Sequence, residues 1–322
     1  MTTYRQLTEI QRCQIETLKK IGMKQNKIAE VIGVDPATIS RELKRNKGER
    51  GYRHQQAQRK ALERRQNAEK ARKMTDDMVA LVEEKLREEW SPEQVSGWME
   101  KTQDESVSHE RIYQHVWEDK RCGGDLYTHL RHQGKKYQKR SAAKGSRGQI
   151  KNRVSIDKRP AIVDSKTRVG DWEMDLVIGK GHSGALLTIV ERKTLFTLSA
   201  LIEGKHADVV TMTALSLLLP YKDRVHTITV DNGKEFAMHE LIAEELDAKV
   251  FFAHPYSSWE RGLNENTNGL LRQYFPKKMA FDEVTQEMVD EAVNKLNNRP
   301  RKTLDFDTPA KRMAKSLSLL AA

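Results

Sequence analysis

The chain has 322 residues, of which 37% are hydrophobic and 32% are charged. This length allows more than one domain, since a domain takes roughly 100–200 residues. No apolar run reaches the eighteen or so residues that suggest a membrane-spanning helix, and Met1–Gln14 lacks the apolar stretch of a signal peptide. A membrane-spanning protein is therefore excluded, and we expect the protein to stay in the compartment where it is made.

The net charge of +11 is unevenly distributed along the chain. Residues 1–160 carry 36 Lys and Arg against 23 Asp and Glu, a net charge of +13, whereas residues 161–322 carry 21 against 23, a net charge of −2. A basic half of this kind can bind the phosphates of a polyanion with a strong dependence on salt. Charge alone is equally consistent with a solvated basic surface.

Residues 1–48 are predicted to form a helix-turn-helix domain. Two helices come first, the second at Gln25–Ile32, and a tight turn follows at residues 33–35. A third helix begins at Pro36 with Asp35 as its N-cap, and both residue types are favoured at these positions. The residues expected to give the first helix an apolar face are Ile10, Cys13, Leu18 and Ile21.

The third helix is the candidate for reading DNA. Ala29, Gly33 and Ile39 fall where such a domain needs a small contact residue, a turn residue and a core residue. This spacing lets the third helix project into the major groove. Many three-helix domains bind no DNA, so the pattern by itself leaves that alternative open. The residues expected to be exposed near DNA are Thr38, Ser40, Arg41, Lys44 and Arg45.

Three further segments precede the second half of the chain. Residues 49–88 are expected to form a basic helical connector, and residues 89–120 a second helical unit similar to a helix-turn-helix. Because that unit is not basic, a dimerisation or packing role is almost equally consistent with it. Residues 121–165 have many Lys, Arg, Gly and Ser and few apolar residues, which predicts a basic linker, either following DNA or simply disordered.

Strands alternate with helices in residues 166–280. We predict strands at 171–178, 184–191, 195–202, 225–230 and 249–252, helices at 207–219, 235–246 and 258–274, and C-terminal helices within 281–322. A three-stranded meander followed by alternating strands and helices implies an α/β layer with a mixed sheet. The order of elements resembles the ribonuclease H fold. The predicted fold class is therefore multidomain, with N-terminal all-α helix-turn-helix units and an α/β ribonuclease H-like domain.

Three carboxylates stand out by position. Asp175 lies in the first strand, Asp231 directly follows the short fourth strand at an Asn-Gly turn, and Glu265 lies in the long helix. Ends of strands in open α/β sheets commonly bind ligands. Carboxylate oxygens suit Mg²⁺, and two such ions about 3.5–4 Å apart can support in-line attack on a phosphodiester. Arg272 shares the helical face of Glu265 and could hold the substrate phosphate.

Spacing alone leaves other assignments open. Asp171 and Glu173 point to the same strand face as Asp175, and Glu260 is a rival for the third acid. Any single Asp or Glu is also a common cap, turn residue or surface charge. Trp172 and Trp259 are neighbours of acidic residues, and we expect both to be packing residues rather than base-stacking ones.

Longer motifs carry a resemblance to a known family. Residues 170–175 read GDWEMD, residues 229–236 read TVDNGKEF, and residues 254–266 read HPYSSWERGLNEN. Residues 90–94 (WSPEQ) and 298–302 (NRPRK) extend the match over nearly the full chain. The chain resembles the "IS thirty" family of bacterial insertion-sequence transposases, and its second half resembles the integrase catalytic core of DDE transposases. Met174 stands where the family pattern has Gly, a departure that leaves the acids intact.

The resemblance implies a site and an activity. Asp175, Asp231 and Glu265 would be the catalytic acids and the ligands of two Mg²⁺ ions per active site, with Mn²⁺ able to substitute. The implied enzyme is a DNA transposase that binds the terminal inverted repeats of its insertion sequence, cleaves a strand and joins it to target DNA. Joining two ends needs two active sites or one used twice, so we expect at least a homodimer on double-stranded DNA. The implied location is the bacterial cytoplasm, in association with the nucleoid.

Two other functions and a zinc site remain as alternatives. A DNA-binding repressor with an inactive integrase-like half has no reason to keep three acids and Arg272. A ribonuclease H-like nuclease without end recognition is disfavoured by the helix-turn-helix and the basic linker. Cys122, His129 and His132 lie close in sequence, but they do not complete a tetrahedral zinc site.

Overall fold

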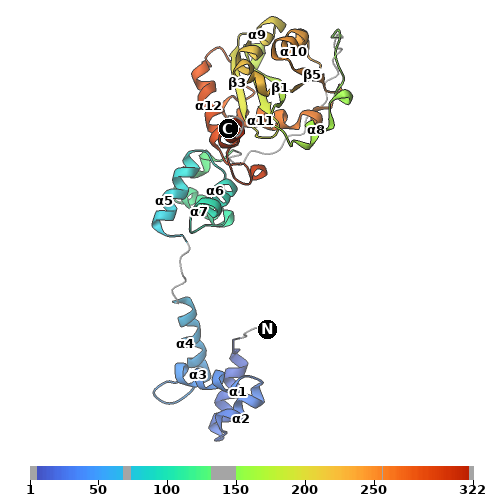
Figure 1. Ribbon diagram of the computed structural model, residues 1–322. Helices are drawn as coiled ribbons and strands as arrows, with labels where there is room; N and C mark the ends of the chain where they lie inside the picture. Colours follow the sequence, from blue (N-terminus) through green and yellow to red (C-terminus); the bar gives the residue numbers. More distant parts are fainter. Residues whose placement is uncertain (1–5, 68–73, 132–149, 256, 319–322) are drawn as a thin grey trace. The chain divides into compact units, whose positions relative to one another are not determined.

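A computed structural model describes residues 6–67, 74–131, 150–255 and 257–318 (Figure 1). It contains two compact units, residues 1–73 and residues 74–322. His132 and most of the basic run of the predicted linker lie outside the described residues. None of the helices within those ranges is long and apolar enough to cross a bilayer.

The described part of the first unit, residues 6–67, contains four helices. Three match the predicted helix-turn-helix: α1 (Glu9–Lys20), α2 (Gln25–Ile32) and α3 (Pro36–Asn46). Asp35 caps α3 by accepting the backbone N–H of Ala37 at 2.7 Å. Gly33 ends α2 with φ 72°, a left-handed conformation that glycine adopts without strain. Ala29 and Ile39 are buried between the helices, as the spacing predicts.

The predicted apolar face of α1 is wrong for three of its four residues, because α1 turns a different face to the core. Arg12 and Ile15 are buried instead, and Leu18 is partly buried. Arg12 can be buried because its Nε donates to Glu42 Oε1 of α3 at 2.9 Å, so neither charge loses its partner. Hydrophobic spacing cannot anticipate a buried ion pair. The exposed residues of the predicted face are Ile10, Cys13 and Ile21.

The segment 49–88, expected to be one connector, contributes to two separate cores. Its first helix, α4 (His54–Gln66), packs on α1 through Ala57, beside the buried Tyr52. Its second helix, α5 (Asp76–Arg87), packs with α6 (Pro92–Thr102) and α7 (His109–Arg121) around Val82 and Leu86. Ala57 and Val82 are each fully buried, which a solvated connector would not show.

Stability of the first unit should depend on Glu16. Its carboxylate accepts the backbone N–H and a ring nitrogen of His54, both at 2.7 Å, and pairs with Lys20. The backbone hydrogen bond of His54 is the largest cause that lowers the pKa of Glu16 from 4.5 to about 2. A carboxyl with a lowered folded pKa stabilises the fold above its unfolded pKa. We therefore expect the free energy of unfolding to fall between pH 4.5 and about 2.

This dependence is measurable by urea denaturation of the fragment 1–73 across that pH range. The variant Glu16→Gln should lose part of the slope, while Glu30→Gln, whose carboxylate forms only an exposed pair with Lys27, should keep it. Identical slopes for all three proteins would show that Glu16 does not control acid stability.

The second unit is built on a five-stranded mixed sheet, as predicted. Its strands are β1 (Asp171–Ile178), β2 (Ala185–Glu191), β3 (Thr197–Ile202), β4 (Thr227–Val230) and β5 (Lys249–Phe252). The strand order is β3-β2-β1-β4-β5, with β1, β2 and β3 antiparallel and β1, β4 and β5 parallel. The predicted bounds of the first and last strands are confirmed.

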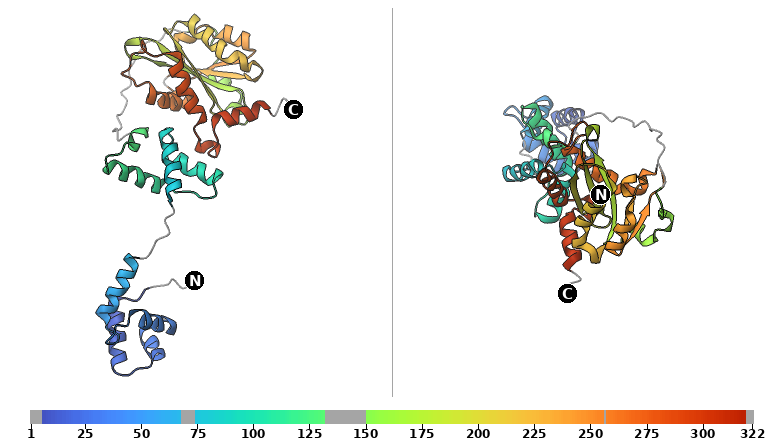
Figure 2. Two further views of the ribbon diagram at one scale, coloured as in Figure 1. Left: turned by 90° about the vertical axis from the view of Figure 1, so that its left-hand side faces the viewer. Right: turned by 90° about the horizontal axis from the view of Figure 1, so that it is seen from above.

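Helices cover both faces of this sheet (Figures 1 and 2). On one face, α9 (Ala207–Leu218) and α10 (His239–Leu246) pack on side chains that include Trp172 and Met174. On the other, α11 (Gly262–Tyr274) and α12 (Gln286–Asn298) pack on Val177 and Leu186. The chain ends with α13 (Pro309–Ser318) in the described part. The odd-numbered residues of β1 therefore face α11.

Two expectations about this unit change. The long helix predicted at 258–274 is a 3-10 turn, Ser258–Arg261, followed by α11. Residues 150–165 are not a linker, because Ile150 packs in the core of the sheet and Val163, in the short helix α8 (Ala161–Ser165), is fully buried. The linker prediction stays untested for residues 132–149, which lie outside the described residues.

Candidate active site

The face of β1 that looks toward α11 carries Asp171, Glu173 and Asp175, and each has a different partner. Asp171 accepts two hydrogen bonds from Arg168, at 2.8 and 2.9 Å, and one from Thr227 Oγ1 at 2.7 Å. These bonds use both oxygens of Asp171, which is 1% exposed. Asp171 therefore ties β1 to β4 and to the chain before it.

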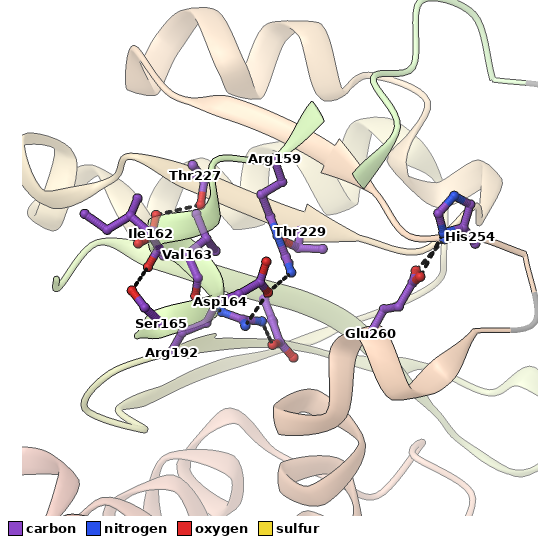
Figure 3. A network of polar contacts seen from close by, with 12 residues as sticks. Arg159, Ile162, Val163, Asp164, Ser165, Arg192, Thr227, Thr229, His254 and Glu260 are labelled. Atoms are coloured by element: carbon purple, nitrogen blue, oxygen red, sulfur yellow. Dashed lines mark hydrogen bonds and ion pairs between the residues drawn. The ribbon is translucent and has the colours of Figure 1, made fainter. Parts of the chain in front are cut away.

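Glu173 holds the start of α11 against β1. Its carboxylate pairs with Arg192 and accepts the backbone N–H of Asn264 at 3.0 Å. Burial raises the pKa of Glu173, and the charge of Arg192 opposes this rise. Figure 3 shows Arg192 within a polar network in which it also donates to the backbone oxygen of Val163, at 3.1 Å. Glu173 is thus fully engaged inside the fold.

Asp175 and Asp231 lie side by side: Asp175 is within β1, just beyond the residues of this strand that pair with β4, and Asp231 directly follows β4. The register pairs Glu173 with Thr229, and two residues further along each strand it brings Asp175 beside Asp231. Arg261 contacts both: Nη1 lies 3.1 Å from Asp175 Oδ2, and Nη2 lies 3.8 Å from Asp231 Oδ2. The structure therefore selects Asp175, among the three acids of β1, as the partner of Asp231.

Hydrogen bonds fix the orientation of both aspartates. Asn268 Nδ2 donates to Asp175 Oδ2 at 3.0 Å, and the backbone N–H of Gly233 donates to Asp231 Oδ1 at 2.8 Å. Burial is the largest cause that raises the pKa of Asp175, and the neighbouring Asp231 raises it further, while Arg261 lowers it. The two carboxylates therefore repel each other and favour a cation between them.

Glu265 lies on the face of α11 that is turned toward this pair. Asn268 follows it by three residues, so the two share one helical face, and Arg261 lies in the 3-10 turn just before α11. Both neighbours contact Asp175 directly, and the Glu265 side chain is exposed. Within the described ranges, however, no group of three His, Cys, Asp or Glu residues is close enough to hold a single metal ion.

Two other carboxylates lie near the aspartates in sequence or space. Glu260, the rival third acid, is held by His254, whose Nδ1 lies 2.8 Å from Glu260 Oε1 (Figure 3). Glu235 was missed by the sequence reasoning. Its pKa is raised by burial and, to a lesser degree, by the charges of Asp231 and Asp175. Its position four residues after Asp231, in the motif TVDNGKEF, is the sequence feature that could have identified it.

The pair Asp175 and Asp231 fits a divalent cation in chemistry. Both supply hard carboxylate oxygens, which Mg²⁺ and Mn²⁺ prefer. A positive group already lies between them, since Arg261 reaches both carboxylates. Arg261 Nε is buried and makes no hydrogen bond to any described residue, so the guanidinium acts on the pair through its charge and the contacts of Nη1 and Nη2.

Arg272 links α11 to the end of β1. Its Nη2 donates to the backbone oxygen of Ile178 at 2.8 Å and its Nη1 to that of Phe275 at 3.3 Å. Burial lowers the pKa of Arg272. A contact with substrate phosphate stays a prediction.

We expect Arg272→Ala to reduce the rate of DNA cutting more than Lys277→Ala does. The reverse order in a cutting assay would move the phosphate contact away from this helix face.

The two tryptophans differ in exposure. Trp172 is fully buried in the sheet core, as predicted. The packing role predicted for Trp259 is wrong, because its side chain is 74% exposed in the 3-10 turn before α11. Because residues 258–261 form this turn and not a regular α-helix, helical spacing does not predict the direction of the Trp259 side chain.

The exposed face of α3 is strongly basic. Arg41, Lys44 and Arg45 are exposed together with Ser40, whereas Thr38 is half-buried. A groove of about 420 Å³ runs beside this face. Two arginines of α4 that the sequence does not predict to be near DNA, Arg64 and Arg65, line the groove with Arg41 and Arg45. Because the packing of α4 against α3 was not foreseen, sequence spacing could not place them there.

Comparison with known proteins identifies the family. A family model described as a helix-turn-helix domain matches residues 3–46. A transposase for insertion sequence element IS4351 from Bacteroides fragilis is 48% identical over 94% of this chain and 94% of its own length. The chain belongs to the IS30 family of insertion-sequence transposases. The transposase InsI for insertion sequence element IS30A from Escherichia coli (strain K12) is 36% identical, over 97% of this chain and 84% of its own length.

Membership of this family makes the chain a DDE-type transposase. Among solved structures, the catalytic core domain of BIV integrase is 21% identical, with a TM-score of 0.39, and the match covers 47% of this chain and 98% of that chain. The mixed sheet, with α9 and α10 on one face and α11 on the other, agrees with the ribonuclease H-like fold expected from the order of elements.

Proposed function

We propose that this transposase binds the terminal inverted repeats of its insertion sequence and cuts and joins DNA strands at Asp175, Asp231 and Glu265. The observation that carries the proposal is the pair of aspartates within β1 and directly after β4, both in contact with Arg261. Glu265 shares the helical face of Asn268, which donates to Asp175 Oδ2 at 3.0 Å. One α/β unit thus presents the residue types that phosphodiester chemistry requires.

Each residue of the site has a separate task in this proposal. Asp175 and Asp231 would hold divalent metal ions, Mg²⁺ or Mn²⁺, with Glu265 as the third ligand, two ions per site. Such ions supply activation of a water or sugar hydroxyl and stabilisation of the leaving oxygen. Asn268 and the Gly233 N–H keep the aspartate oxygens oriented. Arg261 neutralises the pair before the ions arrive, and we expect its guanidinium to turn toward substrate phosphate afterwards.

The test is the cutting of a labelled duplex that carries the DNA flanking this gene, with Mg²⁺, with Mn²⁺ and with chelator. Cutting at the element end that needs a metal is the expected result. Tight binding without cutting under any metal would instead favour a repressor, the competing function for a chain with a helix-turn-helix. Cutting without end preference would favour a ribonuclease H-like nuclease.

Recognition of the DNA ends is assigned to α3 with help from α4. We expect the fragment 1–73 to bind the end duplex, with log K falling by about 0.9 per phosphate contact for each unit of log salt. Arg45→Gln, on the exposed face of α3, should reduce the magnitude of that slope by about 0.9, the value of one phosphate contact. Lys27→Gln on α2 is the matched control. Binding that is insensitive to salt would contradict the electrostatic account.

Assembly on DNA follows from the reaction proposed. Two element ends must be cut and joined, and each chain contributes one pair of aspartates from one sheet. We therefore propose at least a homodimer on double-stranded DNA, with target DNA bound in the same complex. Light scattering of the complex with end duplex should give a mass of two chains or more, and a complex with a single chain would contradict this.

A further inference from the structure

The 74–322 unit contains a polar pocket whose lining includes neither Asp175 nor Asp231. Its volume is about 190 Å³. It is formed where the start of α6 meets the segment after α12, and one side of α11 contributes to its wall. Gln94 Nε2 donates to the backbone oxygen of Pro300 at 2.8 Å across this junction. The pocket therefore joins the motifs WSPEQ (90–94) and NRPRK (298–302), to which the proposed active site gives no role.

Three arginines line this pocket, which we call the arginine pocket: Arg131, Arg299 and Arg301. Only one carboxylate, Glu89, lines it with them. Glu89 lies 3.4 Å from Arg299 Nη2 and also accepts a hydrogen bond from Tyr274. The lining therefore carries three positive charges against one negative charge.

The positive charge of the arginine pocket is not fully used inside the fold. Arg299 is 3% exposed, and its Nε makes no hydrogen bond to any described residue. Arg301 donates from Nη2 to the backbone oxygen of Leu296 at 2.9 Å, and no carboxylate in the described ranges forms an ion pair with it. A buried donor without an acceptor is costly, so a ligand that accepts hydrogen bonds would be stabilised here.

The three guanidiniums also lie close enough to affect one another. Burial, together with the charges of Arg299 and Arg131, lowers the pKa of Arg301 to about 10. The pKa of Arg131 is lowered by burial and by the charge of Arg299. The Nη2 atom of Arg131 lies against Gly269 of α11. Mutual repulsion of this kind is relieved when an anion binds between the charges.

We propose that the arginine pocket binds one backbone phosphate of the DNA on which this transposase acts. Guanidinium forks match the oxygens of a phosphate, and the volume is smaller than the roughly 300–1,000 Å³ of pockets that enclose drug-sized ligands. Asn266, which lines the pocket, directly follows Glu265 on α11. A phosphate held here would therefore be fixed to the helix that carries the third acid.

The proposal depends on the proposed function, since it takes DNA as the substrate. Its test uses binding in chelator, so that it does not depend on cutting. The full chain is titrated with the flanking-end duplex at several salt concentrations, as wild type, Arg301→Gln, Arg301→Lys and the control Arg121→Gln. Arg121 is an exposed residue at the end of α7, and its replacement by Gln removes the same formal charge as Arg301→Gln does.

We expect Arg301→Gln to weaken binding about tenfold and to reduce the salt slope by about 0.9, the value of one phosphate contact. Arg301→Lys should recover the slope, and Arg121→Gln should behave as wild type. An unchanged slope in Arg301→Gln would overturn the proposal, even if the variant unfolds at a lower temperature, because the arginine pocket would then be structural only.

Thermal unfolding in inorganic phosphate distinguishes two possible ligands of the arginine pocket, a DNA phosphate and a free anion. At equal ionic strength, phosphate should raise the unfolding temperature of the wild type more than chloride does, and this difference should disappear in Arg301→Gln. Stabilisation by phosphate together with an unchanged DNA salt slope would assign the pocket to a free anion and overturn the DNA proposal. If the binding results hold but metal-dependent cutting is absent, the proposed function fails while the phosphate site stands.

Discussion

Asp231→Asn is expected to abolish DNA cutting and to leave binding of the DNA ends intact. Asparagine keeps the size of the side chain and an oxygen that accepts the Gly233 N–H, which lies 2.8 Å from Asp231 Oδ1. It removes the negative charge that a divalent metal ion needs. We expect a loss of rate of about 10³-fold or more, equivalent to about 4 kcal/mol of transition-state stabilisation. Cutting rate and dissociation constant are measured in parallel on the same duplex.

The matched control for this variant is Asp223→Asn. Asp223 is an exposed carboxylate of the same unit, in the 3-10 turn after α9, and it should cut as wild type does. If Asp231→Asn lost binding as well as cutting, misfolding or a role in DNA binding would explain the result better. Cutting at the wild-type rate would remove Asp231 from the site.

Glu173→Ala is expected to destabilise the second unit by about 3–5 kcal/mol, the cost of leaving a buried charge without its partner. The Arg192 side chain would lose its buried ion pair, and the Asn264 N–H at the start of α11 would lose its acceptor. Asp175→Asn on the same strand face should not destabilise the fold. The raised pKa of Asp175 means that folding favours its neutral form, and asparagine is neutral.

Urea denaturation of the full chain compares the two variants, with the second unit followed by tryptophan fluorescence, because all five tryptophans of the chain lie in that unit. A midpoint that falls for Glu173→Ala and stays for Asp175→Asn is expected. Asp175→Asn should nevertheless cut no DNA. The opposite order of stability would mean that Asp175 holds the fold together and that Glu173 is the better candidate for the metal site.

The architecture of the second unit was largely predictable from the sequence. Strand bounds followed from β-branched and apolar runs with turn residues between them, and β1 and β5 match to the residue. Strand order and register were not predictable, because they depend on pairing between residues far apart in the chain. The choice among Asp171, Glu173 and Asp175 needed that register, since alternation puts all three on one face.

Partners supplied by distant segments explain the remaining differences. Arg12 lies inside the first unit only because Glu42, thirty residues later, pairs with it. Spacing placed Arg261 on the helical face of Glu265, but not between two aspartates of the sheet. The exposure of Trp259 follows from the 3-10 turn before α11, which a continuous helical pattern concealed.

Asp175, Asp231 and Glu265 are proposed to form one metal centre. The most direct test of this proposal is the binding of Mn²⁺ to the full chain with end duplex, measured by electron paramagnetic resonance. Asp175→Asn, Asp231→Asn and Glu265→Gln should each lose bound Mn²⁺, whereas Glu260→Gln, whose carboxylate is held by His254, should bind as wild type. Retention of Mn²⁺ by Glu265→Gln, with its loss in Glu260→Gln or Glu235→Gln, would contradict the assignment of the third acid.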